Sequence, residues 1–129
     1  MRLLLDTRVL LWWLDDNPAL GREARDLIGV GRNEVFVSAV SAAEVAIKSS
    51  VGKLRVPEDL EEQLDRNAFT PLPLRVRHGL ALGDLPMHHR DPFDRLLIAQ
   101  ATCEDLTVVT ADRAFVAYDV RIVEAAAVR

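Results

Sequence analysis

The sequence of 129 residues contains only one cysteine and three histidines. A lone Cys103 excludes an internal disulfide and any zinc site built from several cysteines. The three histidines also lack the i, i+4 spacing of a helical zinc-binding pair. A cytoplasmic protein follows most simply from this cysteine usage, with Cys103 expected in the core as a small apolar side chain.

A long apolar segment is also absent. The longest uninterrupted apolar run is Val9 to Leu14, whereas a membrane helix needs about 20 residues. Asp6 interrupts the N-terminal leucines, so we expect neither a secretory signal nor a membrane partner. Hydrophobic residues make up 50% and charged residues 28%, values typical of a chain with one buried core. We therefore expect a single domain over residues 1–129.

Basic residues are fewer than acidic ones. The sequence has 16 Lys and Arg against 20 Asp and Glu, which gives a net charge of −4. A generic nucleic-acid-binding protein is usually basic. Net charge alone therefore argues against that class of protein, unless the acidic residues are gathered in one place.

Hydrophobic periodicity predicts alternating strands and helices. Apolar and β-branched runs predict strands at 2–5, 34–38, 107–110 and 120–123, and a short edge strand within 69–74, where two prolines fall. Helical spacing predicts helices at 7–15, 19–30, 41–51, 75–83 and 92–104, and another that begins at Pro57. We expect an α/β fold, a three-layer α/β/α sandwich around a four- to five-stranded parallel sheet.

Acidic residues follow the predicted strands. Asp6 comes directly after the first strand, and Glu44 lies about one helical turn after the second. Asp112 lies two residues after the fourth strand, and Asp91 and Asp94 open the helix that leads into that strand. Because ligands bind at the carboxyl edge of parallel strands, where the strand order reverses, we expect three to five of these carboxylates to converge there, Asp94 among them only if its helix begins at that edge.

A cluster of three to five carboxylates is costly without a cation. Two carboxylates about 4 Å apart repel each other by roughly 4 kcal/mol at an effective dielectric constant of ~20. Carboxylate oxygens select Mg²⁺ or Mn²⁺, and such an ion activates water and neutralises phosphate charge in phosphodiester hydrolysis. Without these five acids the chain has 16 basic and 15 acidic residues, so its net charge is compatible with an RNA substrate.

Each carboxylate also has a purely structural interpretation. Asp6 and Asp91 are suited to cap helices, and Glu44 precedes Lys48 by four residues, the favourable orientation for a helical ion pair. Asp94 could complement the helix dipole, and Asp112 could be a turn residue. Joint placement at one sheet edge, rather than any single acid, therefore favours a metal site.

Four segments carry recognisable motifs: LLLDTRVLLWWL (3–14), VSAVSAAEVAIKSSVGKL (37–54), LPMHHRDPFDRLLIAQA (85–101) and LTVVTADRAFVAYDV (106–120). They resemble PIN-domain ribonucleases, and more narrowly the toxins of VapBC-type toxin–antitoxin systems. The resemblance covers nearly the whole chain and is weakest between residues 55 and 84.

The resemblance implies a Mg²⁺- or Mn²⁺-dependent endoribonuclease that acts as a toxin and cleaves structured RNA, such as tRNA or rRNA, with metal-activated water. It implies a cognate antitoxin and a homodimer as partners. The residues that match catalytic and metal-binding positions are Asp6, Glu44, Asp94 and Asp112, with Asp91 as an outer ligand.

Three other residues are candidates for substrate contacts. Thr110 matches a hydroxyl position that often faces the site in the family. Arg8 stands where the family commonly has histidine, and it could hold a phosphate or pair with an acid and depress activity. Arg90 belongs to a His88-His89-Arg90 loop that either contacts the RNA backbone or is simply solvated.

Two further groups of residues have open interpretations. Arg75, Arg77 and His78 could form a second basic patch for RNA. Trp12 and Trp13 are adjacent, so we expect one in the core and the other exposed unless a partner covers it.

The sequence is also compatible with two alternative functions. A phosphohydrolase with an aspartate nucleophile would need a second aspartate two residues after Asp6, where Arg8 stands. A non-catalytic module that binds RNA or protein would not need the intact set of acids.

Overall fold

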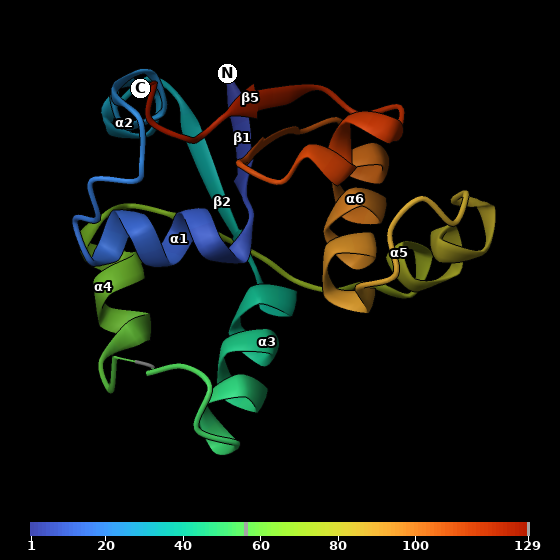
Figure 1. The fold of residues 1–129 in the computed structure, drawn as a ribbon, viewed down its shortest axis with the longest axis horizontal. Helices are drawn as coiled ribbons and strands as arrows, with labels where there is room; N and C mark the ends of the chain where they lie inside the picture. The colour runs from blue at the N-terminus through green and yellow to red at the C-terminus, as the bar shows by residue number, and fades with distance from the viewer. Residues whose placement is uncertain (56, 129) are drawn as a thin grey trace.

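The computed structural model describes residues 1–55 and 57–128, and it confirms the predicted three-layer α/β/α fold (Figure 1). Five parallel strands form one sheet in the order β3-β2-β1-β4-β5. The strands are β1 (Arg2–Leu5), β2 (Glu34–Ser38), β3 (Thr70–Leu72), β4 (Thr107–Thr110) and β5 (Ile122–Glu124). The helices are α1 (Thr7–Leu14), α2 (Arg22–Gly29), α3 (Ala39–Ser50), α4 (Leu60–Arg66), α5 (Val76–Ala81) and α6 (Pro92–Glu104), with short 3₁₀ helices η1 (Leu82–Asp84) and η2 (Arg113–Ala117).

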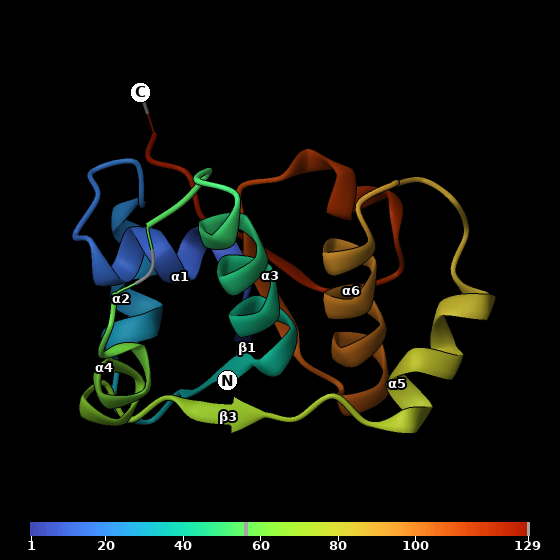
Figure 2. The ribbon, with the colours of Figure 1, turned by 90° about the horizontal axis from the view of Figure 1, so that it is seen from below.

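The central strand β1 shows how the layers are built. Its side chains alternate between the two faces of the sheet. Leu3 and Leu5 are buried with residues of α1 and α2, whereas Leu4 is buried with residues of α3 and α6. Helices α3 and α6 lie side by side on that second face (Figure 2). The nearly continuous apolar strands of the sequence are therefore explained by burial on both faces.

The strand order reverses between β1 and β4. The chain runs from β1 outward through β2 to β3, returns through α6 to β4 on the other side of β1, and ends at β5. The backbone N–H of Asp6 still donates to the carbonyl of Val109, 3.1 Å away, so the two strands stay paired up to their ends. Segments that follow β1 and β4 diverge from this point, which is where ligands bind in open parallel sheets.

Several element boundaries differ from the predictions, although β1, β2, β4 and α6 have the predicted bounds. Helix α3 begins at Ala39 rather than 41 because the Ser38 side chain accepts a hydrogen bond from the Val40 N–H. Helix α2 begins at Arg22 rather than 19 because Leu20 forms an antiparallel bridge with Ala126. Other elements are shifted too: α4 begins at Leu60 rather than 57, α5 covers 76–81 rather than 75–83, α1 ends at Leu14 rather than 15, and β5 covers 122–124 rather than 120–123.

The predictions for Cys103 and for the two tryptophans were wrong. Cys103 is exposed, because α6 turns Leu97, Ile98 and other residues towards the core. Trp12 and Trp13 are both partly buried against the core, instead of one being buried and the other exposed. The wide indole rings lie along the core's edge, and the Trp13 Nε1–H donates to Asn67.

The sequence suggested that His78 belongs to an exposed basic patch, and this prediction was wrong. It is fully buried, and its Nδ1 accepts a hydrogen bond from the Arg75 N–H. Its Nε2 lies 2.9 Å from Glu104, which also pairs with Arg77. These contacts hold α5 against α6 and lower the pKa of Glu104.

Among the described residues, no helix has the length and apolar character of a membrane span.

The close approach at Gly21 makes a testable prediction about stability. Its N–H donates to the Ala125 carbonyl, and a Cβ at this position would lie 2.7 Å from the backbone oxygen of Ala126. We expect Gly21→Ala to lower the free energy of unfolding by about 1–3 kcal/mol, as overpacking does elsewhere. The measurement is urea denaturation.

Gly79→Ala is the matched control. A Cβ at Gly79 meets no atom within 4 Å, and alanine favours a helix over glycine. This variant should be as stable as the parent or more so. Equal stability of the two variants would contradict the packing argument at Gly21.

Candidate metal centre

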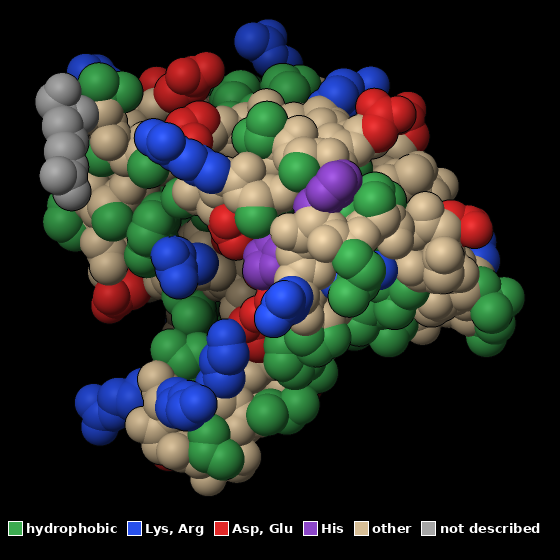
Figure 3. Space-filling view, turned by 45° about the vertical axis from the view of Figure 1, so that its right-hand side comes forward, with side chains coloured by type: hydrophobic (Ala, Val, Ile, Leu, Met, Phe, Trp, Pro, Cys, Tyr) green, Lys and Arg blue, Asp and Glu red, His purple; other side chains and the backbone are tan. Residues whose placement is uncertain are grey.

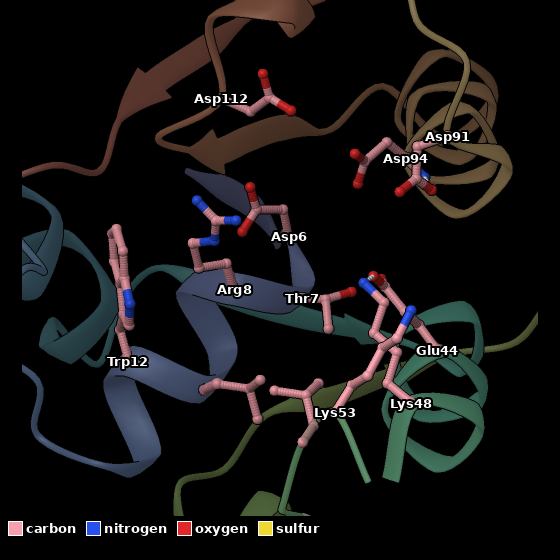
Figure 4. Close-up of a pocket in the computed structure, with 12 residues that line it drawn as sticks. Asp6, Thr7, Arg8, Trp12, Glu44, Lys48, Lys53, Asp91, Asp94 and Asp112 are labelled. Carbon is pink, nitrogen blue, oxygen red and sulfur yellow. Dashed lines mark hydrogen bonds and ion pairs between the residues drawn. The ribbon is translucent and has the colours of Figure 1, made fainter. Parts of the chain in front are cut away.

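A pocket of about 620 Å³ opens at the carboxyl ends of β1 and β4. All five predicted carboxylates line it, and they come from four separate parts of the chain (Figure 4). These residues are Asp6 after β1, Glu44 on α3, Asp91 and Asp94 at the start of α6, and Asp112 after β4. All five therefore lie at the predicted sheet edge, and among the described residues the carboxylate oxygens that come within 4.8 Å of each other and of a histidine nitrogen are those of Asp94 and Asp112, beside His89.

Asp6 combines a structural contact with a place in the pocket. Its Oδ1 accepts a hydrogen bond of 2.8 Å from the Val9 N–H and so caps α1. Only 5% of the residue is exposed, and burial raises the pKa of its carboxyl group from 3.8 to about 6. The polar side chain of Thr110 and the nearby Arg8 lower that pKa in part. Negative charge at Asp6 is thus costly in the metal-free protein.

Thr110 lies beneath the pocket rather than in its lining. The hydroxyl is buried, and its oxygen accepts a hydrogen bond of 3.0 Å from the Asp112 N–H. Asp112 in turn accepts from the Ala114 N–H and caps η2. Thr110 also lies close enough to Asp6 to lower the pKa of its carboxyl group, so it adjoins both residues at the reversal point.

The start of α6 places two carboxylates next to each other. Asp91 is the expected N-cap, because its Oδ1 accepts hydrogen bonds from the N–H groups of Phe93 and Asp94. Burial and the negative charge of Asp91 raise the pKa of Asp94 to about 7, and His89 counteracts this increase. Proton binding to Asp94 is therefore favoured unless a cation is present.

Glu44 shows a polar atom without a partner. The residue is 5% exposed, and its Oε2 accepts a hydrogen bond of 2.5 Å from Lys48, so the predicted helical pair exists. The other oxygen, Oε1, is buried and has no hydrogen-bond partner among the described residues. An unpaired buried carboxylate oxygen is costly. A divalent cation would satisfy it, and carboxylate ligands fit Mg²⁺ or Mn²⁺.

His89 is the site residue that sequence reasoning missed. Its Nε2 lies 2.9 Å from Asp94 Oδ2 and 3.0 Å from Asp112 Oδ2. The sequence suggested a phosphate contact or a solvated loop, but the ring is turned towards the carboxylates. The available signal was its place within the HRDPFD motif, five residues before Asp94.

Cationic side chains border the acidic centre. Arg8, Lys48 and Lys53 line the pocket, and Figure 3 shows acidic and histidine side chains in a hollow with Lys and Arg around it. Over residues 1–55 and 57–128, Arg8 makes no ion pair within 4 Å, although it lies near Asp6. Arg90 is exposed in the loop before α6 and is not part of the lining. Trp12 adds an apolar wall on the side of α1 (Figure 4).

Comparison with known proteins gives a consistent result. Residues 3–121 match the PIN domain family. Similar solved structures include VapBC2 from Rickettsia felis bound to a DNA fragment, with a TM-score of 0.73, 18% identity and coverage of 97% of this chain and 99% of that chain. DNA-bound VapBC from Salmonella typhimurium has a TM-score of 0.69, 19% identity and coverage of 96% and 98%.

VapBC-1 from nontypeable Haemophilus influenzae is similar to the same extent, with a TM-score of 0.68, 16% identity and coverage of 96% and 98%. At these identities the likeness is one of fold. A comparison with curated protein sequences gave no match.

Proposed function

Because the chain belongs to the PIN domain family, whose members are generally nucleases, we propose that it is a Mg²⁺- or Mn²⁺-dependent endoribonuclease and the toxin of a toxin–antitoxin pair. One observation carries this proposal. Five carboxylates from four parts of the chain converge on one pocket, where a buried oxygen of Glu44 has no hydrogen-bond partner among the described residues.

Four carboxylates would hold the cation: Asp6, Glu44, Asp94 and Asp112. A bound Mg²⁺ or Mn²⁺ would lower the pKa of a water molecule and neutralise charge on the scissile phosphate. Thr110 accepts from the Asp112 N–H and so supports Asp112, and Lys48 orients Glu44. Asp91 contributes negative charge and fixes the start of α6, as an outer member of the set.

RNA is the substrate class that the charge distribution supports. Arg8 and Lys53 line the pocket beside the acids and are placed to bind phosphates that flank the scissile bond. Arg90, exposed outside the lining, would contact phosphates farther along the strand. A structured RNA, such as tRNA or rRNA, presents its backbone in loops that can enter a pocket of this size.

Two protein partners belong to the proposal. The similar structures named VapBC suggest a cognate antitoxin, which would cover the pocket and place a basic side chain among its carboxylates. A second copy of the chain would form a homodimer. We expect the protein to act in the cytoplasm, where its RNA substrates are.

Metal-dependent cleavage of RNA is the direct test. The purified chain should cleave a tRNA or rRNA mixture when Mg²⁺ or Mn²⁺ is added and should lose this activity in excess EDTA. Products should carry a 5′-phosphate and a 3′-hydroxyl, as ligation and mass spectrometry can determine. Undiminished cleavage in EDTA would contradict the proposal, as would intact RNA after incubation with protein that binds Mn²⁺.

A further inference from the structure

The backbone and the ring of His89 are both fixed by contacts with neighbouring side chains. Its backbone N–H donates to the Tyr118 hydroxyl at 2.8 Å, and Arg95 donates to the same hydroxyl at 3.2 Å. The ring also packs edge-on against Phe115, with 6.1 Å between ring centroids. The loop before α6 therefore presents the imidazole in a defined orientation.

The hydrogen bonds of the ring identify its tautomer. The N–H of Asp91 points at Nδ1, at a distance of 3.1 Å. A backbone N–H can only donate, so Nδ1 is the acceptor and carries no proton. The proton of the neutral ring must then be on Nε2, which lies between Asp94 and Asp112. The Nε2–H of His89 thus donates to Asp112, and Oδ2 of Asp94 lies 2.9 Å from the same nitrogen.

This arrangement indicates that His89 is not itself a direct metal ligand. Ligand atoms of His89, Asp94 and Asp112 lie within 4.8 Å of one another, as a three-residue metal site would require. A histidine that binds metal through Nε2 carries its proton on Nδ1 and donates it to an acceptor. Here Nδ1 faces a donor instead, so coordination through Nε2 would set two N–H groups against each other.

We propose that His89 is a positioning residue, whose Nε2–H donates to Asp112 and lies against Asp94, and which so orients the two carboxylates towards a divalent cation in the pocket. This inference rests on the metal-dependent function proposed above. The two acids belong to different parts of the chain, at the start of α6 and after β4. The hydrogen bond from Nε2 fixes Oδ2 of Asp112, the close contact with Nε2 holds Oδ2 of Asp94 beside it, and further lone pairs of both carboxylates are left for the cation.

Two substitutions distinguish the contact of Nε2 with the carboxylates from the hydrogen bond that Nδ1 accepts within the loop. In His89→Asn the amide oxygen can occupy the place of Nδ1 and accept from Asp91, but no donor reaches the carboxylates. In His89→Gln the amide nitrogen can occupy the place of Nε2 and restore that donor, but the acceptor for Asp91 is lost. His88→Asn is the matched control, since His88 is exposed and its ring lies against Tyr118.

Calorimetric titration with Mn²⁺ is the readout. We expect His89→Asn to bind Mn²⁺ about 10–100-fold more weakly than the parent, the range for lost outer-shell contacts. Affinity of His89→Gln should stay within about threefold of the parent, as should that of His88→Asn. Parent-like affinity of His89→Asn would overturn the proposal, and so would an equal loss in His89→Gln when urea denaturation shows both variants folded.

Spectroscopy of bound Mn²⁺ gives a second readout. In the parent, electron spin-echo modulation should lack the coupling of a directly bound imidazole nitrogen. Such a coupling would make His89 a ligand and overturn the positioning role. The proposed nuclease function fails separately: parent protein that neither binds Mn²⁺ nor cleaves RNA contradicts both ideas, whereas an active parent with an unaffected His89→Asn variant contradicts only this one.

Discussion

Asp6→Asn should abolish RNA cleavage and leave the protein at least as stable as the parent. The asparagine oxygen can still accept from the Val9 N–H, because asparagine caps helices as well as aspartate does. The charge that would hold the cation is lost, and several kcal/mol of transition-state stabilisation correspond to roughly 10³-fold in rate. Single-turnover cleavage of a labelled RNA measures this effect.

The expected gain in stability follows from the burial of Asp6. With a pKa of about 6, the Asp6 carboxyl group is ionised at pH 7.5, although burial makes its charge unfavourable. A neutral amide has no charge to desolvate. Urea denaturation in EDTA should therefore place the midpoint of Asp6→Asn at or above that of the parent. Asp26→Asn, on the exposed side of α2, is the control and should change neither quantity. Cleavage by Asp6→Asn within tenfold of the parent would rule out the assigned role.

The sequence predicted the central elements well because their signals are local. β1, β2 and β4 are short apolar runs buried on both faces, and α6 has its cap and its proline in sequence. Boundaries set by distant contacts were missed. Leu20 leaves the helical region to pair with Ala126, more than a hundred positions away in the chain, and no local pattern indicates this.

The same distinction applies to the site. Convergence of the five acids follows from the topology, since every parallel strand delivers its carboxyl end to one edge. The orientation of His89 depends on Tyr118 and Arg95, which are brought together only by the folded chain. Likewise, the Glu44–Lys48 pair is visible from spacing, but the burial that leaves one Glu44 oxygen without a partner among the described residues is not.

Stability of the metal-free protein should fall as the pH rises from about 5 to 7.5, and a divalent cation should reverse this fall. Burial raises the pKa of Asp6 to about 6 and that of Asp94 to about 7, from 3.8. Over this range the unfolded chain has already lost both protons while the folded chain still holds them, so higher pH favours unfolding. For the buried Asp6, the rise of the pKa from 3.8 to about 6 corresponds to a loss of unfolding free energy on the order of 3 kcal/mol.

A cation competes with those protons, so its effect should grow with pH. Thermal unfolding at pH 5, 6, 7 and 8, in EDTA and in Mn²⁺, should show a small metal-induced rise in Tm at pH 5 and a larger one at pH 8. Glu104, whose pKa is lowered, has the opposite sign but titrates below 4.5, outside this window. In Asp6→Asn the decline in EDTA should be shallower, since one of the two protons is removed from the balance. A metal-induced rise in Tm that is equal at pH 5 and pH 8 would show that the cation does not bind at these carboxylates.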